Sequence, residues 1–84
     1  MKDNYDQIYN EVFKEYFTDL RKNKRYTRKY VSERIGIKQP TYTCYEQGLR
    51  TCPLSVFKKL CNLYNLDFLD TFRQLDEIVS KRVG

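Results

Sequence analysis

Positively charged side chains are concentrated in the middle of the sequence. Positions 21 to 50 carry nine Lys or Arg residues but only two acidic residues, Glu33 and Glu46, which is a local charge of +7. The flanking segments 1–20 and 51–84 count to −3 and +1, in agreement with the formal net charge of +5. The nine cations are Arg21, Lys22, Lys24, Arg25, Arg28, Lys29, Arg34, Lys38 and Arg50. Guanidinium and ammonium groups gathered in this way attract phosphate oxygens, so the segment predicts contact with nucleic acid.

The residue types that catalysis and metal binding require are scarce. The chain has no His and three cysteines, Cys44, Cys52 and Cys61, none of them in CxxC spacing. A tetrahedral zinc site would lack a usual fourth ligand, and neither acid–base nor nucleophilic catalysis has a recognisable motif. We expect three reduced thiols, with Cys61 in the core. We expect no enzyme activity, cofactor, metal or small-molecule ligand.

Eighty-four residues predict one domain over 1–84, and eight Tyr and five Phe supply much of its apolar surface. No apolar run approaches the roughly 20 residues that span a bilayer. The acidic N-terminus lacks the basic start and apolar stretch of a signal peptide. A cytoplasmic protein with no membrane partner is therefore expected.

Apolar side chains recur at three- and four-residue spacing along the chain, which predicts an all-α fold of five helices. The first helix is expected over about residues 3–23. Its apolar stripe comprises Ile8, Val12, Phe13, Tyr16, Phe17 and Leu20.

Two short helices joined by a glycine turn are predicted within the basic segment. Thr27 is a suitable N-cap for a helix over 28–35. Gly36 follows as a C-cap that can adopt positive φ. A second helix over 39–47 then ends at Gly48.

Two more helices complete the predicted fold. The fourth begins near Cys52 or Pro53, with Thr51 as its cap, and its inner stripe comprises Leu54, Phe57, Leu60, Cys61 and Tyr64. The fifth begins at Asp67 or Asp70 and runs to about residue 80, with frayed residues beyond. Its apolar positions are Phe68, Leu69, Phe72, Leu75, Ile78 and Val79.

The pattern over about residues 20–69 resembles the phage repressor and Cro type of helix-turn-helix domain, the Xre family. The residues that carry the resemblance are Arg21, Thr27, Gly36-Ile37 and Glu46-Gln47-Gly48. It implies a five-helix lambda-repressor-like fold with the motif at about 27–48 and the C-terminal helix at about 67–80. It also implies sequence-specific binding to double-stranded DNA by a transcriptional repressor of phage or mobile-element type.

The third helix is the base-reading element of such a domain. Its spacing turns Tyr42 and Tyr45 inward, and the resemblance assigns base contacts to the outward residues Gln39, Pro40, Thr43 and Cys44. The Gln39 amide can pair bidentately with adenine. Phosphate contacts are expected from Arg28, Lys38, Gln47, Arg50 and Thr51, and the alternative is a solubilising basic surface. Tyr26 and Tyr30 are expected to flank the DNA backbone.

Two further expectations concern packing. The resemblance implies a partly buried ion pair between Arg21 and Glu46 that ties the first helix to the third. Three side chains of the fifth helix are expected to stay exposed on a monomer and to form the interface of a two-fold homodimer, namely Phe72, Leu75 and Val79. The alternative is that the fifth helix packs entirely on the first.

A different class of function stays open at this point. The helix-turn-helix could serve as a scaffold for protein interaction, for example as an antitoxin-like module. The basic segment favours DNA binding, whereas the shortage of Lys and Arg on the outward face of the third helix leaves room for a protein partner.

Overall fold

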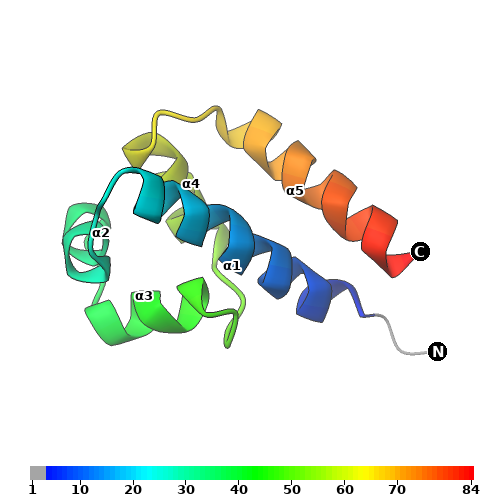
Figure 1. The fold of residues 1–84 in the computed structure, drawn as a ribbon, viewed down its shortest axis with the longest axis horizontal. Coiled ribbons are helices and arrows are strands. Elements are labelled where there is room, and N and C mark those ends of the chain that lie inside the picture. The colour runs from blue at the N-terminus through cyan, green and yellow to red at the C-terminus, as the bar shows by residue number, and fades with distance from the viewer. Residues whose placement is uncertain (1–3) are drawn as a thin grey trace.

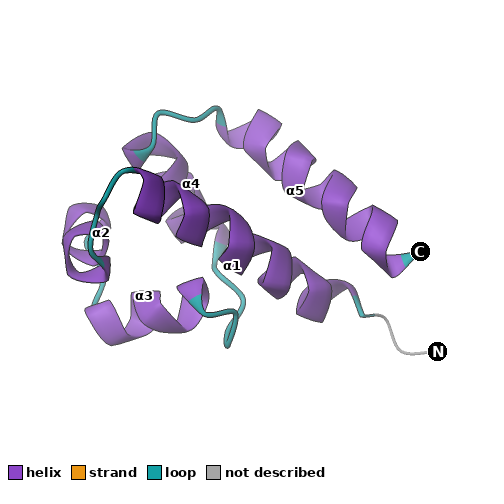
Figure 2. Ribbon diagram, in the orientation of Figure 1, coloured by secondary structure: helices purple, strands orange, loops and turns teal. Residues whose placement is uncertain are grey.

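The computed structural model describes residues 4–84, which form five α-helices joined by short turns (Figure 1). The helices are α1 (Tyr5–Asn23), α2 (Arg28–Ile35), α3 (Gln39–Glu46), α4 (Leu54–Leu63) and α5 (Phe68–Val83). No strand occurs in this part of the chain (Figure 2). The prediction of an all-α, five-helix, lambda-repressor-like fold is confirmed.

The long helix α1 is the element around which the others are arranged. It contacts α5 along one side and α3 on the other, while α2 contacts both α3 and α4. Figure 1 shows α5 running antiparallel to α1, and α2 and α3 gathered at the end of the molecule where α1 finishes. The helix-turn-helix pair is therefore mounted on α1 and α4.

Aromatic side chains from separate helices form the centre of the core. The ring centroids of Phe13 and Phe17 in α1 are 4.6 Å apart, and they lie 6.1 and 5.6 Å from that of Phe57 in α4. All three side chains are buried. Because an aromatic side chain removes about 150–250 Å² from water, this cluster contributes strongly to holding α1 against α4.

Four helices end in the same kind of turn. The residues after α1, α2, α3 and α4 that adopt positive φ are Arg25 (59°), Gly36 (75°), Gly48 (74°) and Asn65 (61°). In each turn the next N–H donates to the carbonyl oxygen five residues earlier, at 2.8–3.0 Å, as in a Schellman motif. At Gly48 a Cβ atom would also lie 3.1 Å from the Asn10 carbonyl oxygen of α1. Glycine is required there both by φ and by this close approach.

The ends of α4 and α5 differ from the sequence predictions. Pro53, not Thr51, is the N-cap residue of α4, because its extended backbone conformation delays the helix to Leu54. Leu54 was expected in the core, but it lies in the exposed first turn, and Val56 is buried instead. Asp67 is the N-cap of α5, accepting from the Asp70 N–H at 2.8 Å, and α5 continues to Val83 past the expected fraying point. The expected start of the first helix at residue 3 lies outside the described residues.

The prediction that Leu75 and Val79 stay exposed is wrong. Both side chains are completely buried, because α5 lies along α1 and turns the stripe Thr71, Leu75 and Val79 toward the core. Leu75 and Val79 therefore cannot form an exposed dimer surface in this fold. The alternative, that α5 packs entirely on α1, holds for Leu75 and Val79 but not for Phe72, whose side chain is 37% exposed. The other exposed apolar side chains of α5 are Leu69, Ile78 and Val83.

Candidate nucleic-acid interface

Local hydrogen bonds define the start and end of α2. The Thr27 hydroxyl oxygen accepts from the Tyr30 N–H at 3.0 Å and satisfies a donor in the first turn. At the other end, the left-handed conformation of Gly36 reverses the chain toward α3. Lys38 provides no side-chain cap to α3, as its chemistry predicts, since an ammonium group cannot accept a hydrogen bond.

Helix α3 has distinct buried and outward sides. Tyr42 and Tyr45 are buried, as the three-residue spacing predicts. Gln39 and Pro40 are exposed in the first turn, and Thr43 and Cys44 are half-buried in the second. The four residues expected to contact bases therefore keep access to solvent, while the inward tyrosines fix the orientation of the helix.

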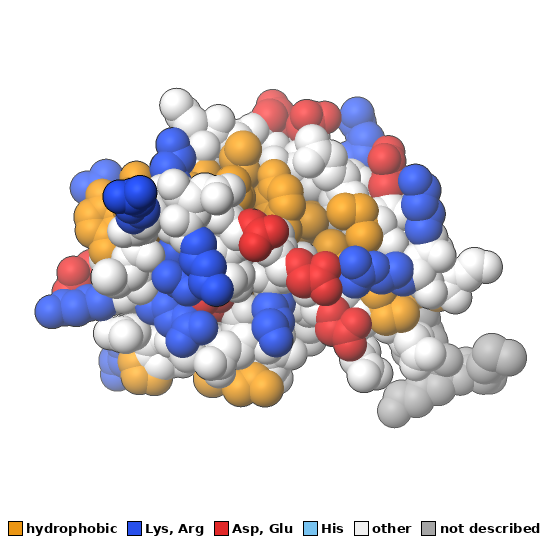
Figure 3. Space-filling model, viewed as in Figure 1, with side chains coloured by type: hydrophobic (Ala, Val, Ile, Leu, Met, Phe, Trp, Pro, Cys, Tyr) orange, Lys and Arg blue, Asp and Glu red, His pale blue; other side chains and the backbone are white. Residues whose placement is uncertain are grey.

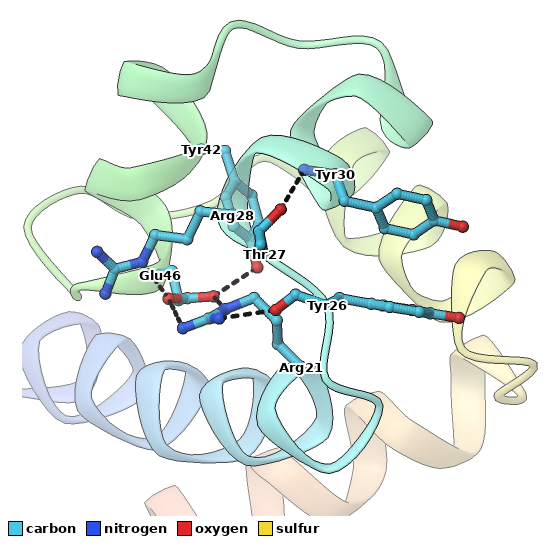
Figure 4. A network of polar contacts seen from close by, with 7 residues as sticks. All are labelled: Arg21, Tyr26, Thr27, Arg28, Tyr30, Tyr42 and Glu46. Atoms are coloured by element: carbon cyan, nitrogen blue, oxygen red, sulfur yellow. Dashed lines mark hydrogen bonds and ion pairs between the residues drawn. The ribbon is translucent and has the colours of Figure 1, made fainter.

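A buried carboxylate joins the three helices around this element (Figure 4). The Glu46 side chain is inaccessible to solvent, and Arg21 of α1 donates to it through Nε at 2.6 Å and Nη2 at 3.1 Å. Arg28 of α2 donates through Nε at 2.7 Å, and the Tyr42 hydroxyl donates at 2.7 Å. Arg21 also donates from Nη1 to the Tyr26 carbonyl oxygen at 3.0 Å. The Arg21–Glu46 pair is present at the positions the resemblance implied.

The charges of this network stabilise each other. Burial opposes ionisation of Glu46, but the hydrogen bonds from Arg21, Arg28 and Tyr42 outweigh it, so the pKa of Glu46 lies below its usual value. The hydrogen bond to Glu46 raises the pKa of Arg21. Burial, and then the hydrogen bond to the carboxylate, raise the pKa of the Tyr42 hydroxyl. Glu46 is thus an anion and Tyr42 a neutral donor at ordinary pH.

Sequence reasoning missed two partners of Glu46. Arg28 was expected to contact phosphate, whereas its Nε is committed to the carboxylate, although 37% of its side chain remains exposed. Tyr42 was assigned to apolar packing alone. Its position four residues before Glu46 on the same helix was the available signal, because residues at that spacing are neighbours on a helix surface.

The remaining expected phosphate contacts lie around the ends of α3. Lys38 immediately precedes the helix, and Gln47, Arg50 and Thr51 follow it, all four with exposed side chains. Figure 3 shows Lys and Arg side chains gathered at the end of the molecule that carries α2 and α3, with acidic side chains over the middle of α1. The outward side of α3 is therefore bordered by cationic and hydrogen-bonding side chains.

Comparison with known families agrees with this geometry. A family model described as Helix-turn-helix matches residues 18–70, which is more than half of the chain. The chain belongs to the Xre-type helix-turn-helix family. It is accordingly a DNA-binding domain of the transcription-regulator type, a family that is typically non-enzymatic. Searches of curated proteins and of solved structures found no match.

Two tyrosines of this helix-turn-helix domain, expected to flank the DNA backbone, pack against each other. The Tyr26 and Tyr30 rings lie 4.6 Å apart, and Tyr26 stacks at 6.0 Å on the buried Tyr64. Figure 4 shows Tyr30 and Arg28 leaving α2 in opposite directions. The two rings thus form one aromatic surface on the side of α2 away from Arg28.

The thiols have a packing role in the helix-turn-helix domain. Cys52 and Cys61 are buried, Cys61 as expected, and Cys44 is half-buried on α3. Burial, reinforced by the neighbouring Cys61, raises the pKa of Cys52 to about 12, so this thiol stays protonated.

Within residues 4–84, no group of three or more His, Cys, Asp or Glu side chains could hold a metal ion. None of the helices there is long and apolar enough to cross a membrane.

Proposed function

We propose that this protein is a transcriptional repressor of phage or mobile-element type that binds a specific duplex DNA sequence through α3. The observation that carries the proposal is the exposure of Gln39 and Pro40 on the first turn of α3, while Tyr42 and Glu46 of the same helix are buried. A helix held in this way can enter the major groove without disturbing the core.

The roles proposed for individual side chains follow from their chemistry. Gln39 pairs with an adenine through its amide, and Thr43 donates a hydrogen bond or places its methyl group against a thymine methyl. Pro40 and Cys44 make apolar contacts with base edges. Lys38, Gln47, Arg50 and Thr51 contact phosphates and set the register of the helix. Arg28 contributes charge to the same backbone while it remains paired with Glu46.

A two-fold homodimer is part of the proposal, because one recognition helix reads too few base pairs to single out a site. The support comes from exposed apolar side chains beside a pocket of about 230 Å³, which is lined by residues of α1, the loop before α4, α4 and α5. Leu54 and Phe72 line this pocket, and Leu69 is one helical turn from Phe72 on α5. The three side chains are 64%, 37% and 68% exposed. This surface replaces the one expected from the sequence, which included Leu75 and Val79.

Selection of bound sequences from a random duplex pool tests the proposal directly. We expect enrichment of one motif with two related half-sites about one helical turn apart. A domain that only binds proteins would give no saturable sequence preference. If no sequence is enriched even at low salt, where phosphate contacts are strongest, the proposed function is contradicted.

A further inference from the structure

A second basic surface lies between α2 and α4. An open pocket of about 360 Å³ is lined by Arg34 and Ile35 of α2 and by Lys59, Asn62 and Leu63 of α4. Ile35 is buried and Leu63 half-buried, so aliphatic side chains contribute to the lining, whereas Arg34, Lys59 and Asn62 are exposed. No acidic side chain is among the lining residues. The pocket therefore combines apolar area with two cations and an amide.

An aromatic ring extends this surface. Tyr30 is 39% exposed, and the guanidinium carbon of Arg34 lies 5.9 Å from the centre of its ring. Tyr30 is backed by Tyr26, which in turn stacks on the buried Tyr64. The ring is thus held in place before any partner arrives, and a preordered side chain loses less entropy on binding.

The cations of the pocket are not used elsewhere. Neither Arg34 nor Lys59 forms an ion pair with any residue between positions 4 and 84. Tyr30 points away from α2 in the direction opposite to Arg28 (Figure 4), and none of the residues that line the pocket donates a hydrogen bond to Glu46. It is therefore separate from the Glu46 network.

We propose that the pocket between α2 and α4, together with the adjoining ring of Tyr30, docks a short acidic segment of a partner protein. Carboxylates of the segment pair with Arg34 and Lys59, and an adjacent apolar or aromatic side chain packs on Leu63 and Tyr30. Tyr and Arg are the residue types that dominate the energetics of protein interfaces. A nucleic-acid backbone would match the two cations but would leave the aliphatic part of the pocket without a counterpart.

Selection from a library of random 12-residue peptides, with the whole protein as bait, supplies a probe for the pocket. We expect recovered peptides to share Asp or Glu next to Phe, Tyr or Leu. Fluorescence anisotropy then compares the recovered peptide on the wild type and on Arg34→Glu, Lys59→Glu and Tyr30→Ala. Each substitution should weaken binding by about tenfold or more, the effect of losing a principal interface side chain. Arg73→Glu, at a 70% exposed arginine of α5, is the matched control and should retain wild-type affinity.

Three outcomes would overturn the inference. The first is that recovered peptides carry no acidic residue or bind the charge-reversed variants as well as the wild type. The second is that Arg34→Glu and Lys59→Glu weaken binding to duplex DNA as much as Arg50→Glu does, which would make the pocket a contact with the DNA backbone. The third is displacement of the peptide by millimolar inorganic phosphate, which would indicate a small-anion site. Circular dichroism checks that the variants fold, and Lys59→Gln provides a milder substitution at the same position.

Discussion

Glu46 fixes the relative positions of three helices because its two carboxylate oxygens are shared among Arg21, Arg28 and Tyr42. A buried pair of this kind is weak evidence for net stability when it is compared with apolar packing. Removal of one partner is a different matter, since it leaves another charge buried without compensation. Without the Glu46 carboxylate, the charge of Arg21 would be left buried and unpaired, because only 12% of its side chain is exposed.

We therefore expect Glu46→Gln to lower the free energy of unfolding by about 3–5 kcal/mol at neutral pH. The wild type should also lose stability in acid. The pKa of Glu46 is lower in the folded than in the unfolded protein, where a Glu has a pKa of about 4.3. Its ionised carboxylate therefore stabilises the folded state fully at pH values above the unfolded pKa. This stabilisation disappears as the pH falls through the folded pKa. Urea unfolding from pH 7 down to pH 2 measures both effects. The exposed Glu33→Gln is the control, and equal stability losses for the two variants would contradict the role given to Glu46.

The base-reading role of Gln39 has its own test. Gln39→Ala should weaken specific binding by about 1–3 kcal/mol and leave non-specific binding nearly unchanged, because its amide would contact a base edge and not a phosphate. Titration of the selected duplex and of a scrambled duplex separates the two quantities. Arg50→Ala should weaken both. If Gln39→Ala changes neither affinity nor preferred sequence, α3 is not seated in the groove as proposed.

At the scale of the helices, the four Schellman turns set the angles between successive elements. Gly36 and Gly48 adopt positive φ without a steric penalty, and Asn65 is among the residues that tolerate it. Arg25 does not belong to this group, yet it has φ of 59° between α1 and α2. Its conformation is maintained by the surrounding bonds, from Arg25 N–H to the Lys22 carbonyl oxygen and from Tyr26 N–H to the Arg21 carbonyl oxygen.

Arg25→Gly should raise the free energy of unfolding by about 0.5–1 kcal/mol. Relief of the roughly 1–2 kcal/mol cost of left-handed backbone is partly offset by the greater freedom of glycine in the unfolded chain. Thermal and urea unfolding measure the change. Lys24→Gly is the matched control, because Lys24 has φ of −85° and should be destabilised by glycine. If Arg25→Gly is instead less stable than the wild type, the interactions of the arginine side chain stabilise the fold by more than its left-handed backbone destabilises it.

The helices that sequence predicted best are those with local signals. Thr27 and Gly36 defined α2 to the residue, because a cap and a left-handed glycine act within one turn of the chain. Leu54, Leu75 and Val79 were misjudged because their burial depends on which neighbouring helix covers them, and periodicity contains no such information. The same limit applies to Arg28, whose bond to Glu46 joins residues 18 positions apart. The direct base and phosphate contacts stay predictions.

At the scale of the whole molecule, charge is distributed unevenly, with positive side chains at the α2–α3 end (Figure 3). If about six phosphates are neutralised per half-site, the logarithm of affinity should fall with the logarithm of salt concentration at a slope of about −5 per protomer. Binding isotherms between about 50 and 200 mM salt give the slope. A slope near zero would exclude binding through phosphates.

Assembly is the second property of the whole molecule. Leu69→Glu should abolish the proposed dimer without unfolding the protomer, because this side chain is 68% exposed. Sedimentation at micromolar concentration, with and without an operator-length duplex, measures the effect. Glu77→Gln on the exposed side of α5 is the control. A wild type that is monomeric under both conditions would refute the dimer, and loss of secondary structure in Leu69→Glu would show that the leucine serves the fold instead.

The division of α3 between Tyr42, Tyr45 and Glu46 on one side and Gln39, Pro40 and Thr43 on the other bears on how this protein can diverge. Substitution of an exposed side chain usually changes stability by no more than about 0.5 kcal/mol, so Gln39 and Pro40 can vary while the scaffold stays intact. If α3 reads bases as proposed, the target sequence can therefore change through a few substitutions that leave the fold stable. The same separation makes the domain a suitable frame for a library randomised at the exposed positions Gln39 and Pro40.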